Sequence, residues 1–156
     1  MYLSNLVIEG YRCFNEKTEI PLNKGLTVII GENGSGKSAI IDAIRLILND
    51  DEFGKSVVSE RDFWHSFGKS QNKTSTSFQI DIEFSGLTSV EQVAYLPWLK
   101  TDDLSTASLH LKVQNKTNQN KYYKKELWGG NSSSSSFEWE TYKSIQCTYL
   151  PPLREA

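Results

Sequence analysis

The stretch Gly31-Glu32-Asn33-Gly34-Ser35-Gly36-Lys37-Ser38 decides the fold. It matches G-x-x-x-x-G-K-[ST] at every fixed position, a pattern typical of loops that wrap nucleotide phosphates. Residues 26–30 before it are apolar and β-branched, which predicts a buried strand. Residues 39–48 after it are helix formers and aliphatic side chains, which predict a helix. Strand, glycine loop and helix in this order distinguish a phosphate-binding loop from a chance match.

Each position of the loop has a physical role. Glycines allow backbone conformations that a Cβ would forbid, so successive N–H groups can turn inward as a nest for an anion. The N-terminus of the following helix adds unpaired donors and about half a positive charge. Lys37 is expected to reach the β- and γ-phosphates, and the Ser38 hydroxyl to ligate Mg²⁺. The predicted ligands of ATP (or GTP) are Asn33, Gly34, Ser35, Gly36, Lys37, Ser38 and Ala39. The alternative, a glycine-rich turn with a surface lysine, would make these offsets a coincidence.

Composition sets broad limits on function. The 156 residues suffice for one domain, and 17 Lys and Arg against 19 Asp and Glu leave a net charge of −2. No basic excess therefore indicates nucleic acid binding by this segment. Cys13 and Cys147 are far apart, which is neither a disulfide framework nor a zinc site and is typical of a reduced, cytoplasmic setting. Met1 is followed by strand-like sequence without a signal peptide, and no apolar run approaches the ~20 residues of a membrane span, so no membrane partner is expected.

Hydrophobic periodicity predicts the remaining elements. Strands are expected at 3–14 and 18–22, joined to the next run by a turn at 23–25, and the acidic residues 50–52 should end the helix. A short helix capped by Ser59 is expected at 59–64, and a longer one capped by Thr88 or Ser89 at 88–99. Further strands are predicted at 78–84, 109–113, 122–128 and 137–142, with links at 115–121 and 129–136; the five serines 132–136 form a solvated hairpin loop.

A second carboxylate site is missing. A working phosphate-loop ATPase needs an Asp or Glu at the end of another buried strand, to position Mg²⁺ and the nucleophile. Asp50 falls at a helix end and Asp81 alternates onto a solvated face, so neither fits. Gly129-Gly130 is not the signature that ABC-type ATPases insert across a dimer, because nothing helical is expected after it. No catalytic residue is therefore assigned, and the chain is expected to be the amino-terminal piece of a longer enzyme.

Two motifs together resemble a known branch of ATPases. Gly10-Tyr11-Arg12-Cys13-Phe14, followed by the loop at 31–38, resembles the opening of RecF/SMC-like ABC-type ATPases. Residues 59–64 (SERDFW), 78–84 and 150–154 (LPPLR) are similar to the ATPase half of the OLD (overcoming lysogenization defect) family of ATP-dependent endonucleases. The resemblance implies an α/β P-loop NTPase with a mixed β-sheet and an antiparallel β subdomain, β-rich over about 78–147. Residues 1–156 would form an incomplete ATPase head.

The resemblance also implies site residues and partners. Arg12 would contact the phosphates or ribose, the alternative being a strand-end arginine in a surface ion pair. Asp62 would sit near Mg²⁺, the alternative being a solvated or capping side chain. Two heads would close on ATP as a homodimer and control a DNA-cutting TOPRIM domain outside this chain. Two other functions stay open: a DNA-repair or anti-phage ATPase of the same branch without nuclease activity, and a non-hydrolysing module that dimerises on ATP.

Overall fold

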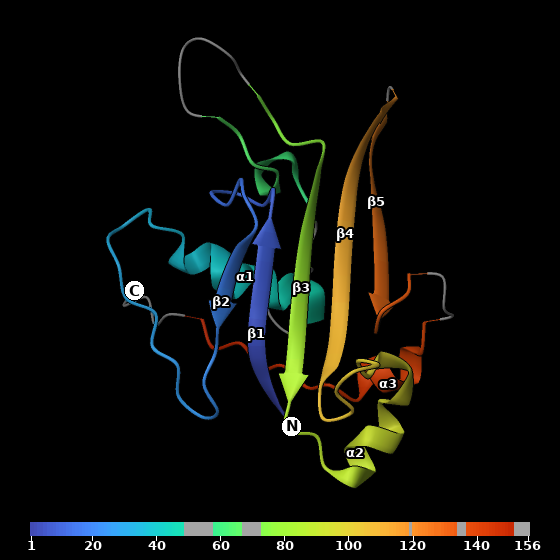
Figure 1. Cartoon of the computed structure of the whole chain (residues 1–156). Helices are drawn as coiled ribbons and strands as arrows, with labels where there is room; N and C mark the ends of the chain where they lie inside the picture. The colour runs from blue at the N-terminus through green and yellow to red at the C-terminus, as the bar shows by residue number, and fades with distance from the viewer. Residues whose placement is uncertain (49–57, 67–72, 119, 134–136, 152–156) are drawn as a thin grey trace.

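The computed structural model describes residues 1–48, 58–66, 73–118, 120–133 and 137–151. Five strands form one sheet in the order β2-β1-β3-β4-β5, in which every neighbouring pair is antiparallel (Figure 1). The strands are β1 (Tyr2–Glu9), β2 (Thr18–Pro21), β3 (Ser77–Ser85), β4 (Ala107–Asn118) and β5 (Asn120–Gly129). The helices are α1 (Lys37–Leu48), α2 (Ser89–Ala94) and α3 (Trp139–Lys143), with 3₁₀ turns η1 (Glu60–Asp62) and η2 (Leu96–Trp98).

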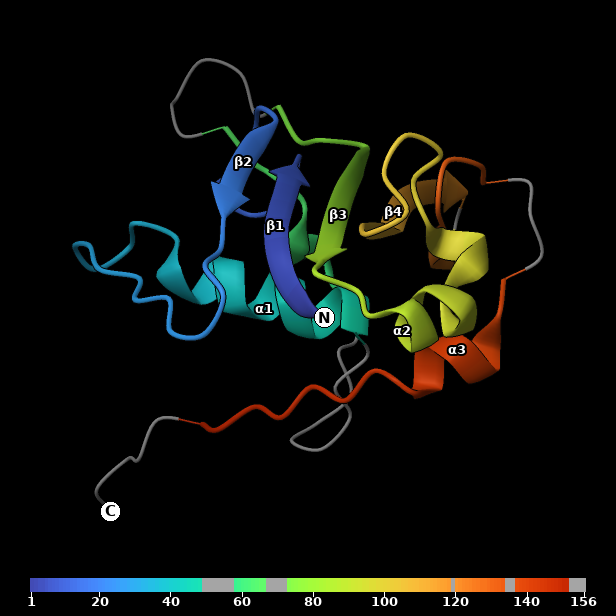
Figure 2. The ribbon, with the colours of Figure 1, turned by 60° about the horizontal axis from the view of Figure 1, so that its bottom comes forward.

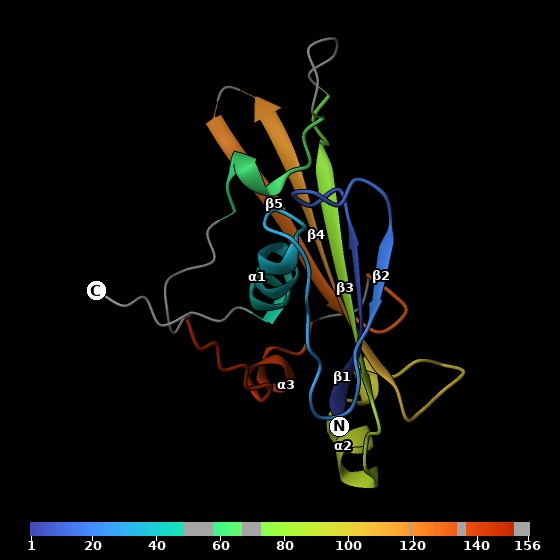
Figure 3. The same ribbon diagram turned by 90° about the vertical axis from the view of Figure 1, so that its left-hand side faces the viewer.

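Helix α1 covers one face of the sheet, as Figure 3 shows edge-on. On β3, Phe78, Ile80, Ile82 and Phe84 are buried on that side, while the residues between them are half-buried on the other. This period of two is what a sheet with one covered face requires, and it confirms the strand predicted at 78–84.

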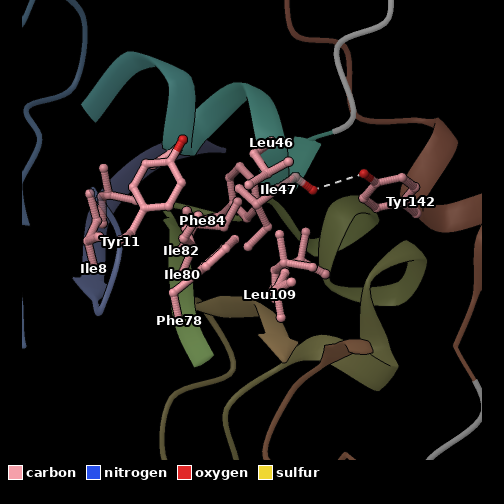
Figure 4. Packing of buried hydrophobic residues seen from close by; sticks show 14 of the residues in the cluster. Ile8, Tyr11, Leu46, Ile47, Phe78, Ile80, Ile82, Phe84, Leu109 and Tyr142 are labelled. Atoms are coloured by element: carbon pink, nitrogen blue, oxygen red, sulfur yellow. Dashed lines mark hydrogen bonds between the residues drawn. The ribbon is translucent and has the colours of Figure 1, made fainter. Parts of the chain in front are cut away.

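The core lies between α1 and the sheet. Helix residues Ala39, Ala43, Leu46 and Ile47 are buried there, and the strands contribute Leu6, Ile8, Ile80, Ile82 and Leu109 (Figure 4). Full burial of one such aliphatic side chain is worth about 1.5–3 kcal/mol. The predicted helix is confirmed, although it begins earlier, at Lys37. Only one face of the helix is buried, and Ile41 on another face is 38% exposed.

The buried strand predicted at 26–30 is not formed. The segment has no ladder to any described residue, and Leu26, Val28 and Ile30 are 83%, 69% and 87% exposed. An apolar, β-branched run becomes a strand only when neighbouring strands accept its hydrogen bonds and cover its side chains. Within the described residues, those neighbouring strands are absent. Of the expected strand-loop-helix unit, the loop and the helix are therefore formed and the strand is not.

The strand predicted at 3–14 is shorter than expected. It ends at Glu9, because Gly10 (φ +70°) and Arg12 (φ +47°) turn the chain through left-handed conformations. A Cβ on Gly10 would lie 2.6 Å from the carbonyl oxygen of Ser77. The close approach of the backbone at residue 10 to β3 therefore also requires glycine. The strand predicted at 18–22 is confirmed as β2, and Gly25 (φ +94°) lies in the expected turn.

The strand predicted at 137–142 is wrong, because its second half is helix α3. Trp139 and Tyr142 are spaced by three residues, so one helical face brings their rings edge to face, with centroids 5.9 Å apart. The Tyr142 hydroxyl donates to the carbonyl of Ile47 at the end of α1 (2.9 Å; Figure 4). The five serines therefore precede a helix, and the segment expected to join two strands joins β5 to α3.

Other boundaries moved by a few residues. The helix predicted at 88–99 is divided into α2, capped by Thr88, and η2, which contains Pro97. The link predicted at 115–121 is largely strand, because β4 continues to Asn118. Helices α2 and α3 gather at the end of the sheet that carries the N-terminus (Figure 2). Predictions for residues 50–52, 134–136 and 152–154 lie outside the described residues. In the described part of the chain, no helix has the length and apolar character needed to cross a membrane.

Candidate nucleotide-binding site

The phosphate-loop motif runs directly into the start of α1. Gly34 (φ +85°) and Gly36 (φ +96°) occupy left-handed conformations that favour glycine. The loop is closed by the Ser35 N–H, which donates to the carbonyl of Glu32 (3.2 Å). The first backbone bond of the helix is Ile40 N–H to Gly36 carbonyl (3.1 Å), so the amides before Ile40 in the first turn have no helical acceptor. They form a set of donors at the positive end of α1.

The ammonium group of Lys37 lies over this loop. Its Nζ donates to the carbonyls of Gly31 (2.7 Å) and Glu32 (2.6 Å). Ser38 follows on the first turn of α1 and is exposed. The predicted ligands at 33–39 are thus brought together as amide donors, one cation and one hydroxyl, the groups that a polyphosphate with a hard cation requires.

The turn after β1 packs directly against the loop. A Cβ on Gly36 would lie 2.8 Å from the Cys13 sulfur and 3.2 Å from the Phe14 ring. Tyr11 is buried beneath this turn and meets Phe78 edge to face (centroids 5.0 Å apart). Burial raises the pKa of the Tyr11 phenol above its ordinary value, so the ring stays neutral. The two motifs that carry the sequence resemblance are therefore one packed unit, although the sixteen residues 15–30 separate them.

Arg12 is held between α1 and η1. Its backbone N–H donates to the Asp62 carbonyl (2.9 Å), its Nε to Asp62 Oδ1 (3.0 Å) and its Nη1 to Asp42 Oδ2 (2.5 Å). Arg12 is the one non-glycine with positive φ among the described residues, and such conformations persist where surrounding contacts over-determine them. The ion-pair alternative is thus observed, and the side chain is still 34% exposed beside the loop. Its contact with nucleotide stays a prediction.

Asp62 acts as the partner of Arg12 and as a helix cap. It is 6% exposed, and its Oδ2 accepts from the N–H (2.8 Å) and hydroxyl (3.1 Å) of Ser59. Both carboxylate oxygens are therefore engaged. Among the described residues, no hydrogen bond joins Asp62 to Ser38, and no group of three His, Cys, Asp or Glu could hold a metal. The proposed Mg²⁺ role of Asp62 stays a prediction, and the observed contacts favour the capping alternative.

A cavity of about 460 Å³ opens beside this arginine, lined by Arg12, Cys13, Ser59, Arg61, Asp62, Phe63 and His65. Sequence reasoning did not single out Arg61 or His65 for this position. The only signal was the short capped helix predicted at 59–64, which is confirmed as η1 and carries Arg61 to the cavity. A second cationic side chain thus borders the same cavity as Arg12.

Comparison with known proteins agrees with this geometry. Residues 1–146 match the family described as "AAA ATPase domain". The chain is 36% identical over 83 residues to the chromosome partition protein Smc of Fusobacterium nucleatum, covering 53% of this chain and 7% of that protein. The match therefore spans only a small part of that relative.

Solved structures of SMC proteins share the fold. One, described under ATP-driven dimerization and DNA-stimulated activation of SMC ATPases, superposes with a TM-score of 0.57 at 23% identity, over 92% of this chain and 76% of the other. The Smc head domain of Pyrococcus yayanosii gives 0.56 at 24% identity, over 81% and 22%. At such identities the likeness shows the fold alone: an SMC head-like P-loop ATPase fold with an antiparallel sheet of five strands.

Proposed function

Because this chain belongs to the AAA ATPase domain family, we propose that it is the nucleotide-binding part of an ATPase head and holds ATP with Mg²⁺ at residues 31–38. The single observation that carries this proposal is the loop itself. Two left-handed glycines, the free amides of the first helical turn and the Lys37 ammonium all meet at one end of α1. A helix N-terminus of this kind binds phosphate through donors and dipole together.

Each residue of the site would have one task. The amides of Gly34 and of residues 36–39 would bind the phosphate oxygens, and Lys37 would exchange its loop carbonyls for the terminal phosphates. Ser38 would hold Mg²⁺, which neutralises charge on the phosphates when bound. Arg12 would face the nucleotide from the turn that packs on Gly36, held in place by Asp42 and Asp62.

At the finer level, we propose an OLD-like ATP-dependent endonuclease, in which ATP closes two heads on each other and controls a DNA-cutting domain beyond this chain. The segments at 59–64, 78–84 and 150–154 support this identification. The solved SMC structure that is reported under ATP-driven dimerization of SMC ATPases supports the dimeric arrangement.

Calorimetric titration of ATP with Mg²⁺ tests the site. We expect wild-type protein to bind and to melt at a higher temperature with nucleotide, because a ligand at a hundred times its dissociation constant adds about 2.7 kcal/mol to native-state stability. Lys37→Ala should lose most of that binding. Lys24→Ala removes the same charge from the exposed turn at 23–25, outside the phosphate loop, and should bind as wild type does. Folded wild-type protein that takes up no nucleotide would refute the proposal.

A further inference from the structure

The chain that follows α3 returns along α1. Residues 145–151 belong to no helix or strand, and they pass α1 on the side away from the sheet (Figures 2 and 3). Their side chains alternate between half-buried and exposed: Ile145, Cys147 and Tyr149 are half-buried, and Gln146, Thr148 and Leu150 are exposed. One side of this segment therefore faces the protein. We refer to residues 145–151 as the strap.

Tyr149 of the strap stacks on an arginine of α1. The guanidinium carbon of Arg45 lies 3.8 Å from the centre of the Tyr149 ring. The negative face of an aromatic ring attracts a cation at this distance, and a flat guanidinium that lies over a ring is also restricted in its orientation. The Arg45 side chain is only 19% exposed, so salt screens this contact weakly. The strap therefore helps to hold Arg45 in one direction.

Asp42 connects this arginine to Arg12. One turn before Arg45 on α1, the Asp42 carboxylate accepts from Arg45 Nη1 through Oδ1 (3.4 Å) and from Arg12 Nη1 through Oδ2 (2.5 Å). Because its two oxygens are bound by different guanidinium groups, the carboxylate cannot rotate without losing one of them. A row of contacts thus runs from the strap through two residues of α1 to Arg12.

These contacts matter more for the direction of Arg12 than for stability. The side chains of Arg12 and Asp42 are 34% and 30% exposed, and ion pairs of this kind add little to the free energy of folding. Asp62 holds the Nε of Arg12 from η1, while Asp42 holds Nη1 from α1. The two carboxylates fix the plane of the guanidinium, and no described residue bonds to Nη2, which is available to a phosphate.

We propose that Arg45 and Tyr149 are positioning residues for Arg12, through which the strap raises the affinity of the site for ATP. This role rests on the proposed function, in which Arg12 faces the nucleotide. A long side chain loses rotamer freedom when it binds a ligand, and that loss opposes binding. An arginine already held between two carboxylates has given up this freedom before ATP arrives. Loosening Arg45 should return the freedom to Arg12 and weaken binding.

Calorimetric titration with ATP and Mg²⁺ tests this role. Tyr149→Leu removes the aromatic face and should weaken ATP binding by about two- to fivefold. Tyr149→Phe keeps that face and should restore most of the wild-type affinity. Leu150→Ala changes the next residue of the strap, which is 80% exposed, and should bind as wild type does. Melting without nucleotide shows whether each variant is folded, and Arg45→Gln, expected to lose at least as much affinity, replaces Tyr149→Leu if that variant is not.

A double-mutant cycle with Arg12→Ala separates positioning from general support of the fold. If Tyr149 acts through Arg12, Tyr149→Leu should cause no further loss of affinity once Arg12 has been replaced. A strap that merely stabilises the domain would weaken binding by the same factor in both backgrounds.

Unchanged affinity of Tyr149→Leu, a loss that Tyr149→Phe shares, or an equal loss with and without Arg12 would each overturn the proposal. Arg12→Ala that binds ATP as tightly as wild type would overturn it too, yet leave the phosphate loop as the nucleotide site. Wild type that takes up no ATP would refute the proposed function and the positioning role together, so the two kinds of failure are distinguishable.

Discussion

At the scale of single residues, the two left-handed glycines of the phosphate loop differ in what surrounds them. A Cβ at Gly34 would meet nothing within 4 Å, whereas one at Gly36 would collide with Cys13 and Phe14. Both alanine variants suffer the left-handed strain of about 1–2 kcal/mol. Only Gly36→Ala should add a crowding cost of about 1–3 kcal/mol, because the turn after β1 must move away.

Urea unfolding of Gly34→Ala and Gly36→Ala measures this difference directly. Gly34→Ala is the matched control, since it lies in the same loop with a similar φ. Gly36→Ala should also bind ATP more weakly than Gly34→Ala if Arg12 and the loop work as one unit. Equal unfolding free energies for the two variants would mean that the turn and the loop are not packed together in solution.

At the scale of elements, residues 26–30 lie outside the five-stranded sheet although their sequence favours a strand. Leu26, Val28 and Ile30 expose apolar side chains on a segment that has no strand partner among the described residues, a combination that favours association between molecules. We expect the protein to gain mass with concentration in sedimentation equilibrium, and Val28→Lys to reduce this gain. Val93→Lys introduces the same charge at an equally exposed position on α2 and should leave association unchanged. Association that both variants reduce alike would assign it to general surface hydrophobicity.

The turn before β4 is held by hydrogen bonds to Asp103, and a titration of this carboxyl group tests whether they form. Asp103 accepts from the Ser105 hydroxyl (2.6 Å) and N–H (2.9 Å) and from the Thr106 hydroxyl (2.6 Å). The hydrogen bonds from Ser105 and Thr106 lower its pKa from 3.8 to about 2. Because the folded-state pKa is the lower one, the stabilisation is complete above the unfolded value near 3.8 and is lost as pH falls through about 2.

A carboxyl ¹³C NMR titration of Asp103 checks this expectation. The midpoint should lie near the folded value in wild type and move upward in Ser105→Ala, which removes the largest of the contributing hydrogen bonds. A wild-type midpoint at 3.8 would show that the turn does not form these bonds in solution.

At the scale of the whole molecule, we expect the protein to bind ATP without hydrolysing it. Asp42 and Asp62, beside the turn that packs on the loop, are engaged with Arg12, and Asp81 lies on the opposite face of the sheet, bonded to His110. Glu32 belongs to the loop itself and is exposed, and none of these four carboxylates lies at the end of a buried strand beside the loop, the position from which a nucleophile is oriented. We expect ATP turnover no greater than that of Lys37→Ala, measured as phosphate release, even where wild type binds ATP. Turnover well above the Lys37→Ala level would require a catalytic carboxylate within this chain.

Local patterns determined a good part of this protein. The phosphate loop and its helix, the capped turn at Ser59 and the alternating strand at 78–84 were all predicted, because glycine geometry, capping and hydrophobic period act over a few residues. The same reasoning placed Lys37 and Ser38 in one candidate site and set Arg12 beside them through a resemblance.

Only the tertiary structure decided where a pattern had two physical outcomes. Residues 26–30 and 137–142 both favour strands locally, yet the first finds no neighbouring strand among the described residues and the second forms a helix whose Tyr142 bonds to α1. The ion pairs of Arg12 join residues 12, 42 and 62, and strand register places Lys112 of β4 across from Glu126 of β5. Such features depend on contacts between distant segments, and no local preference encodes which distant groups will be present to make them.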